Sequence, residues 1–281
     1  MPSLPVIESD VELRANRAPH SGAFDASVHL PHRDALVEYL LRLGDDSLIL
    51  GQRLTEWCGH APALEIDLSL ANIGLDLIGQ ATLFLAAAGD LEGRDRDADG
   101  LAFHRDVLAF RNCLMVEQPN GDFAQTIARQ FLFSTFQLSF LEALKDSREP
   151  RIAEVVAKAV KEVTYHAELA ADWVIRLGDG TDESRERMID GLDWHWRFVD
   201  ELFRMDEVET TLAAAGIAAD RTMLRAGFDS TVERVLTEAT IPLPVYPRAV
   251  IGGRVGHHTE HLGHLLAVMQ HLPRSYPGAV W

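Results

Sequence analysis

Apolar residues recur every three or four positions along most of the chain, which places them on one face of a helix. The first such stretch, residues 35–59, ends at Gly59 with Pro62 just beyond, a combination typical of a helix C-terminus. Further helices are expected at residues 62–89, 99–116, 123–144, 150–177, 181–205, 207–215 and 220–239 and from about 256 onward. A convincing alternation of apolar and polar residues, which would favour strands, does not occur. The pattern therefore predicts an all-α protein.

The expected helices are long, and their lengths favour one type of packing. Several run 22 to 28 residues, well above the mean of about 11–12 residues in globular proteins. Long helices with short connections pack as antiparallel bundles. Residues 241–248 contain three prolines and predict an extended connector, whereas residues 1–30 lack a lasting period and predict a flexible extension. We therefore expect a single helical domain over residues 31–281.

Composition and charge narrow the class of protein. Hydrophobic residues make up 47% of the 281 positions and charged residues 25%, as in ordinary soluble proteins. The formal net charge of -17 disfavours nucleic acid and anionic membranes as partners. The N-terminus does not resemble a signal peptide, and no run of 18 residues is apolar without interruption. Cys58 and Cys113 lie in unlike contexts and suggest no disulfide framework, so a soluble, cytoplasmic protein is expected.

Polar residues on helix faces that are otherwise apolar are the candidates for a functional site. They recur at three- or four-residue spacing on three of the expected helices, and the first helix adds Asp45 and Asp46. The members of these rows are Asn72, Asp76, Gln80, Gln130, Ser134, Gln137, Lys158, Glu162 and His166. Two interpretations are open. The rows face solvent or a partner, or they converge at the bundle centre, where di-iron proteins of this architecture bind their metal ions.

A di-iron centre requires about four carboxylates and two histidines, with Glu-x-x-His pairs on two of the helices. Glu162 stands four residues before His166, one more than this motif requires, and no histidine has an acid three residues before it. The helix expected at 123–144 supplies amides where a carboxylate is needed. We therefore expect a satisfied polar network instead of a metal site, in which Glu162 pairs with Lys158 and accepts hydrogen bonds from the amides.

A second group of possible metal ligands lies near the C-terminus. In the stretch "HHTEHLGH", His257, His261 and His264 would share one face of a helix, and zinc favours histidine nitrogen. A terminal helix rich in histidine can equally cover a surface or an interface. The second interpretation is favoured, so no metal is expected in this chain.

Five stretches of the sequence together resemble one known family. They are "RLGDDSLILGQRLTEWCGHAPALEIDLSLANIGLDLIGQA" (42–81), "VEQPNGDFAQTIARQ" (116–130), "KEVTYH" (161–166), "RLGDGTD" (176–182) and "HTEHLG" (258–263). With these stretches the chain resembles the C subunits of bacterial phenylacetyl-CoA ring 1,2-epoxidases, from about residue 35 to the end. The run at 42–81 is long and specific.

The resemblance implies a ferritin-like bundle with additional C-terminal helices and a role in aerobic phenylacetate catabolism. In that family, a catalytic sister subunit carries the di-iron site that adds oxygen to the aromatic ring, and a separate reductase supplies electrons from NADPH. The C subunits have the same fold without the metal and pair with that di-iron subunit, so this chain is expected to hold no cofactor and no catalytic residue. The alternatives are a self-sufficient di-iron oxygenase or oxidase with atypical ligands, and a helical binding module unrelated to oxygenation.

A structural component of such a complex can also contact the CoA part of phenylacetyl-CoA, because its phosphates are bound by arginine, lysine or backbone N–H groups. The resemblance favours three residues near the substrate, which are Phe110, Arg111 and Asn112. The alternative is that Arg111 and its neighbour Arg105 form surface ion pairs with acids such as Asp106 and Glu117.

Overall fold

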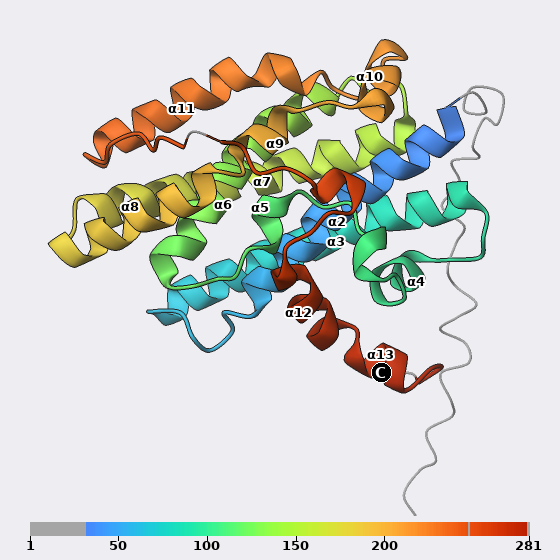
Figure 1. Ribbon diagram of the computed structural model, residues 1–281, viewed down its shortest axis with the longest axis horizontal. Coiled ribbons are helices and arrows are strands. Elements are labelled where there is room, and N and C mark those ends of the chain that lie inside the picture. The colour runs from blue at the N-terminus through green and yellow to red at the C-terminus, as the bar shows by residue number, and fades with distance from the viewer. Residues whose placement is uncertain (1–31, 247, 280–281) are drawn as a thin grey trace, which may run out of the picture. The chain divides into compact units, whose positions relative to one another are not determined.

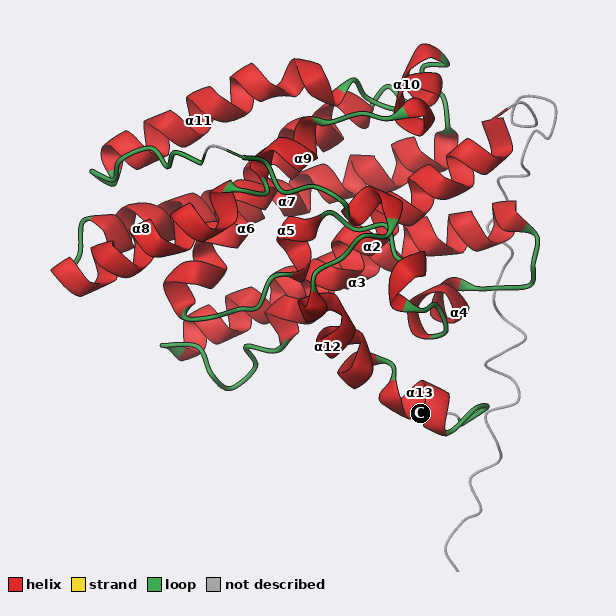
Figure 2. Cartoon of the chain, viewed as in Figure 1, coloured by secondary structure: helices red, strands yellow, loops and turns green. Residues whose placement is uncertain are grey.

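The long helices expected from the apolar periodicity form a four-helix bundle in the computed structural model, which describes residues 32–246 and 248–279 (Figure 1). Its members are α2 (Arg33–Thr55), α3 (Leu64–Glu92), α6 (Phe123–Leu144) and α7 (Pro150–Gly178). Helix α2 packs on α3, α6 packs on α7, and α3 also contacts α7. Figure 2 shows helices joined by loops and no strand in the described residues. The all-α prediction is confirmed, and the bundle is consistent with a ferritin-like fold.

Local sequence explains where the bundle helices begin and end. Helix α6 starts after Asp122, whose side chain accepts a hydrogen bond from the Gln125 backbone N–H at 2.9 Å. Helix α7 starts with Pro150, which is suited to a first turn because that position needs no N–H donor. Helix α3 ends at Gly93, where a φ of 68° is easily adopted by glycine. The bounds predicted for α6 are confirmed, and those of α7 differ by one residue.

The two central helices and the two outer helices of the bundle have different surroundings. Helix α2 is contacted by α3, α5 (Leu114–Glu117) and α10 (Glu207–Ala214), and α6 is contacted by α7, α8 (Asp182–Trp196) and α11 (Arg225–Glu238). Both are therefore buried over most of their length. Helices α3 and α7 bury one face in the bundle and keep the opposite face exposed. These two helices form an outer layer of the described structure.

The helix predicted over residues 99–116 is wrong. The structure has three short pieces instead, α4 (Ala98–Phe103), η3 (Val107–Ala109) and α5. The backbone N–H of Arg111 donates to Asp45 Oδ2 at 2.8 Å, and that of Cys113 donates to Asp46 Oδ1 at 2.7 Å. Both carboxylates lie on α2. They take N–H groups that a continuous helix would use internally, so the connection from α3 to α6 is held open.

Several other boundaries also differ from the sequence-based prediction. Helix α2 ends at Thr55 and not at Gly59, and α3 spans Leu64–Glu92 instead of residues 62–89. The stretch 181–205 is divided into α8 and α9 (Val199–Phe203), and the terminal helix α12 (Glu260–Met269) begins four residues later than expected, followed by α13 (His271–Ser275). Gly256 has a φ of 79°, which is a turn conformation and is incompatible with the start of a helix there.

Two 3-10 turns and an extended connector link the helices of the C-terminal part. Helix α11 follows the 3-10 turn η4 (Arg221–Leu224), and a second such turn, η5 (Gly253–Val255), precedes α12. Residues 241–246 have no regular secondary structure, in accordance with their prolines. Residues from 32 onward pack as one unit. The extension predicted for residues 1–30 lies outside the described residues.

Candidate functional site

A short row of polar side chains lies where α3 faces α7. The amide Nε2 of Gln80 donates to Glu162 Oε2 at 3.0 Å, and one turn away His166 Nε2 lies 3.0 Å from Asp76 Oδ2. Lys158 Nζ pairs with Glu162 Oε1 at 3.2 Å, as the four-residue spacing predicts. We call Asp76, Gln80, Glu162 and His166 the central polar row.

The amides of α6 extend this row into the core. Gln137 Nε2 donates to Gln80 Oε1 at 3.4 Å, so the contact chain runs from α6 through α3 to α7. The Ser134 hydroxyl makes a long contact of 3.5 Å with the Phe131 carbonyl of its own helix. Gln130 is buried, and neither of its side-chain polar atoms has a hydrogen-bond partner in the described part of the chain. Of the two amides on α6, Gln137 is therefore hydrogen-bonded to the central polar row and Gln130 is not.

The outer members of the predicted rows do not reach this centre. Asn72 is exposed on α3, and the Lys158 side chain is 74% exposed. Asp76 is partly exposed, whereas His166 behind it is fully buried. Burial lowers the pKa of His166, although its hydrogen bond to Asp76 opposes that effect. The row thus runs from the surface inward and holds a neutral imidazole at neutral pH.

The donor atoms of the row can be compared with the needs of a pair of iron ions. Asp76 and Glu162 provide two carboxylates and His166 one imidazole, and the remaining donors are neutral amides. Two iron ions need about four carboxylates and two histidines to offset their charge. In the described residues, no three His, Cys, Asp or Glu side chains are arranged to hold a metal ion. This donor set does not fit a di-iron centre.

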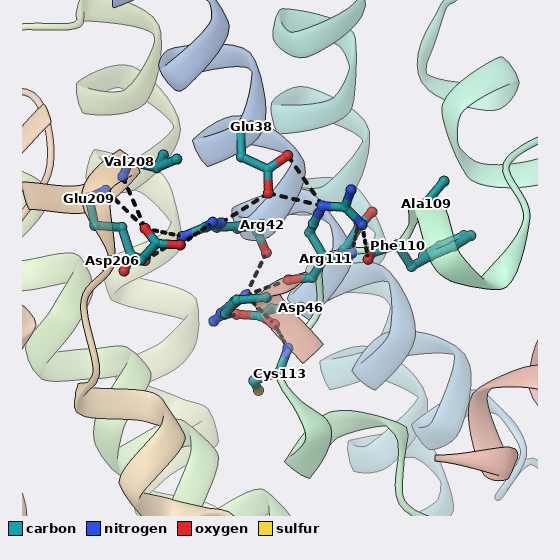
Figure 3. A network of polar contacts seen from close by, with 12 residues as sticks. Glu38, Arg42, Asp46, Ala109, Phe110, Arg111, Cys113, Asp206, Val208 and Glu209 are labelled. Carbon is teal, nitrogen blue, oxygen red and sulfur yellow. Dashed lines mark hydrogen bonds and ion pairs between the residues drawn. The ribbon is translucent and has the colours of Figure 1, made fainter. Parts of the chain in front are cut away.

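A second and denser polar cluster lies on the other side of α2 (Figure 3). Asp45 pairs with Arg105, and both side chains are almost fully buried. Asp46 binds the Arg254 guanidinium through two contacts, of 2.6 and 3.0 Å. Arg42 likewise binds both carboxylate oxygens of Asp206 at 2.6 and 3.0 Å and also contacts Glu38. The α2 ionic network consists of Glu38, Arg42, Asp45, Asp46, Arg105, Arg111, Asp206 and Arg254.

The α2 ionic network connects segments that are far apart in the sequence. Asp45 and Asp46 hold the connection between α3 and α6, and Arg254 brings the segment before α12 to the same place. Sequence reasoning had placed Asp45 and Asp46 with the central row. Their side chains contact the connecting segments instead. The sequence shows only that these two adjacent acids cannot both face the central row, since neighbouring residues on a helix point in different directions.

The three residues predicted near the substrate lie in the extended stretch between η3 and α5. Phe110 is fully buried beneath the Arg105 guanidinium, at 4.3 Å from its ring centre. Asn112 is also fully buried and donates to Glu117 Oε2 at 2.9 Å. The Arg111 side chain is 25% exposed and lies 3.0 Å from Glu38. Arg111 is therefore the member of this trio that reaches the surface, and its ion-pair partner is Glu38 and not Glu117.

A buried carboxylate fixes the start of α12. Glu117 Oε1 accepts from the backbone N–H of Thr259 at 2.6 Å, while its Oε2 lies 2.7 Å from His258 Nδ1. The other ring nitrogen of His258 is 3.0 Å from the Phe110 carbonyl. Because both neighbours are acceptors, the ring must donate from both nitrogens and carry a positive charge. Burial alone would lower the pKa of His258, but Glu117 outweighs it and raises this pKa above its ordinary value of 6.5.

Glu201 on α9 has a similar anchoring role. Its side chain accepts from the N–H groups of Leu114, Gly252 and Gly253 at 2.7, 2.8 and 2.9 Å. Burial raises the pKa of Glu201, against the opposing effect of these hydrogen bonds. Neither Glu117 nor Glu201 was singled out from the sequence as a site residue, because both depend on partners far along the chain.

The histidine cluster predicted near the C-terminus is not formed as expected. Helix α12 begins at Glu260, so His257 lies in the preceding turn and does not share a helix face with His261 and His264. His257 and His264 are exposed. The neighbouring residue, His258, is the histidine that makes the buried contacts described above.

The fold and the polar centre define a class of protein: a helical bundle of ferritin-like type whose central row is poor in carboxylates. Residues 25–281 match a family model described as phenylacetic acid catabolic protein. Over 246 residues the chain is 50% identical to the C subunit of 1,2-phenylacetyl-CoA epoxidase from Escherichia coli (strain K12), covering 88% of this chain and 99% of that protein. The chain belongs to the phenylacetic acid catabolic protein family, and the resemblance seen in the sequence is confirmed.

Proposed function

We propose that this chain is a non-catalytic structural subunit of a phenylacetyl-CoA ring 1,2-epoxidase in aerobic phenylacetate catabolism. The 50% identity to the C subunit of such an epoxidase, over nearly the whole chain, supports this assignment. The chain supports a di-iron sister subunit, which carries the metal site and puts the oxygen atom onto the ring. A separate reductase delivers electrons from NADPH, and the complex works in the cytoplasm.

The composition of the central polar row is the observation that carries this proposal. Two carboxylates, one neutral histidine and several amides leave too little negative charge to retain two iron ions. The residues of the row instead bind one another and link α3, α6 and α7. Their role in the proposal is to stabilise the bundle, and oxygen activation belongs to the di-iron sister subunit.

Size-exclusion chromatography with iron measured across the peaks tests the proposal. Three samples are run in the same buffer after loading with ferrous iron. They are the purified chain alone, the purified di-iron sister subunit alone, and a mixture of the two. We expect the mixture to elute as one complex whose iron follows the content of the sister subunit, with no stoichiometric iron on this chain alone. About two irons per chain in the isolated protein would instead establish a self-sufficient di-iron oxygenase or oxidase. Separate elution of the two proteins would favour an unrelated helical binding module.

The same proposal places phenylacetyl-CoA close to Phe110, Arg111 and Asn112. The chemistry of Arg111 supports this, because a partly exposed guanidinium can bind a CoA phosphate. In the assembled epoxidase, Arg111→Ala is expected to raise KM for phenylacetyl-CoA about tenfold, the size of one charge-assisted hydrogen bond, with kcat little changed. Glu38→Gln is the matched control, since it removes the ion-pair partner and keeps the arginine. Equal effects of the two variants would reduce Arg111 to a structural residue.

A further inference from the structure

The outer face of α3 carries large apolar side chains that nothing in the described residues covers. Leu64, Leu68, Leu75 and Leu83 are 71%, 57%, 63% and 39% exposed, and we call these four residues the leucine stripe. Their spacing of four, seven and eight residues keeps them on one side of the helix. At 1.5 Å per residue the stripe is about 28 Å long. Its length and regular spacing set it apart from single exposed apolar residues, which are common on soluble proteins.

Helix α7 provides an internal comparison, because it has the same length of 29 residues and the same position in the outer layer. Its exposed face is charged over its whole length, with Glu154, Lys158, Lys161, Glu168 and Asp172. From Leu64 to Leu83, a stretch described in full, Glu65 is the one fully exposed charged residue of α3, and Asp67 and Asp76 are half-buried. A helix suited to solvent would resemble α7. The outer face of α3 is instead suited to contact with another apolar surface.

The shape of the exposed face of α3 is suited to packing against another helix. Leu75, Gly79 and Leu83 form a row at four-residue spacing, which is the ridge that helices use when they pack on one another. Gly79 is a notch in this ridge, and a Cβ placed there would meet no atom of the described residues within 4 Å. Tyr165 of α7, 45% exposed, borders the stripe and contacts Ser69 with its hydroxyl at 3.4 Å. Tyrosine beside an apolar stripe is typical of protein interfaces.

Charge and packing decide between the possible occupants of this face. A second copy would bring together two chains that each carry a net charge of -17, which opposes self-association, and an anionic membrane is disfavoured for the same reason. Helix α3 is long and apolar enough to cross a membrane by length and composition, but half of its most apolar segment is buried in the bundle. It therefore cannot leave the bundle without exposing the core. These observations favour a different protein that presents an apolar helix as the occupant.

We propose that the leucine stripe of α3 is the docking surface for the di-iron sister subunit, which lays an apolar helix along it with close approach at Gly79. This inference rests on the proposed function, which supplies the identity of the partner. It adds the place of contact and the kind of surface that the partner must present. The charged outer face of α7 lies outside the contact, apart from the edge marked by Tyr165.

The test compares variants of the stripe with a variant of another surface. Leu68→Asp with Leu75→Asp places two charges on the stripe, and both positions are exposed enough to leave the isolated chain folded. Met223→Asp is the control, because Met223 is 77% exposed on η4 and lies outside the stripe. Binding of each chain to the purified di-iron sister subunit is measured by size-exclusion chromatography and calorimetry. The double variant is expected to weaken binding about 100-fold, and the control to bind as the wild type does.

A second variant separates lost binding from lost folding. Gly79→Leu fills the notch at a position where an added Cβ meets no atom of the described residues within 4 Å, and it replaces a helical glycine, so its thermal unfolding temperature should equal or exceed that of the wild type. It should nevertheless weaken binding to the sister subunit at least tenfold. Normal binding by both stripe variants, with a wild-type complex present, overturns the inference and leaves the proposed function intact. Failure of the wild-type chain to bind the sister subunit refutes the proposed function itself.

Other occupants of the stripe would give their own signatures. Elution of the wild-type chain alone at twice its mass, reduced to a monomer by the double variant, would identify a second copy as the occupant. Cosedimentation of the wild-type chain, and not of the double variant, with vesicles of phosphatidylcholine and phosphatidylglycerol would identify a lipid surface. Either result overturns the assignment to the di-iron sister subunit.

Discussion

The central polar row and the α2 ionic network lie on different sides of the same bundle and use charge in different ways. In the row, two carboxylates share their contacts with amides, one histidine and one exposed lysine. In the network, Asp45 and Asp46 of α2 are matched by Arg105 and Arg254 from distant segments, whose side chains are 3% and 12% exposed. Arg42 of α2 is likewise matched by the distant Asp206, which is 41% exposed. The difference indicates that the strong charges of this protein hold its long connections in place. The two carboxylates of the central polar row make a modest structural contact by comparison.

Among the variants that test this comparison, Asp45→Ala is expected to lower the free energy of unfolding most. It leaves Arg105, with 3% of its side chain exposed, without its carboxylate and removes the acceptor of the Arg111 N–H. An uncompensated buried charge of this kind costs about 3–5 kcal/mol in the free energy of unfolding, measured by urea denaturation. The control is Asp106→Ala, which breaks the pair with Arg274 at a residue whose side chain is 87% exposed. Equal stabilities of the two variants would show that the buried pair of Asp45 and Arg105 stabilises the protein no more than a surface ion pair does.

The His258–Glu117 contact should make the attachment of α12 sensitive to pH. The pKa of His258 is raised in the folded protein, so its stabilising contribution is fully present below its ordinary value of 6.5 and is lost as the pH rises through the folded value. A hydrogen bond to a charged group contributes about 1.5–3 kcal/mol. His258→Gln should therefore be less stable than the wild type at pH 6, and the difference should shrink toward pH 9. A difference that is constant over this range would show that His258 is not charged in the folded state.

Glu162→Ala tests the central polar row itself. The change should lower the free energy of unfolding by about 1–2 kcal/mol, because the buried Gln80 amide loses its acceptor. The lost pair with Lys158 adds little, since that lysine is largely exposed. Activity of the epoxidase should fall only as far as folding and assembly are weakened. A variant that is fully stable and assembled with the di-iron sister subunit but inactive would contradict a purely structural role.

The smallest effect is expected for Gln130→Leu. Neither polar atom of Gln130 has a hydrogen-bond partner in the described residues, so replacing it by an apolar residue of similar size removes no contact. The free energy of unfolding should stay within about 1 kcal/mol of the wild type or rise. Gln80→Leu is the matched comparison and should be destabilising, because Gln80 bonds both Glu162 and Gln137. Equal losses for the two variants would show that Gln130 makes a stabilising contact as strong as those of Gln80.

The contacts that could be predicted from the sequence are the local ones. The pair of Lys158 and Glu162 follows from a four-residue spacing on a single helix, and the start of α6 follows from its capping residue Asp122. The central row was also expected, since polar residues on an apolar face must meet partners. The burial of Phe110 and Asn112 could not be predicted in this way, because it depends on segments that arrive from elsewhere in the chain.

The sequence by itself determined the all-α class, the four long helices and the shortage of carboxylates in the central row, because periodicity, capping and residue type act within a few positions. The tertiary structure decided the path of the connection between α3 and α6. Asp45 takes the N–H of Arg111 from 66 positions away, and that contact holds open a segment in which the local pattern favours a helix. It also decided which face of α3 stays uncovered. Neighbouring elements cover α2 and α6 and leave the leucine stripe exposed in the described residues, and no local rule contains that information.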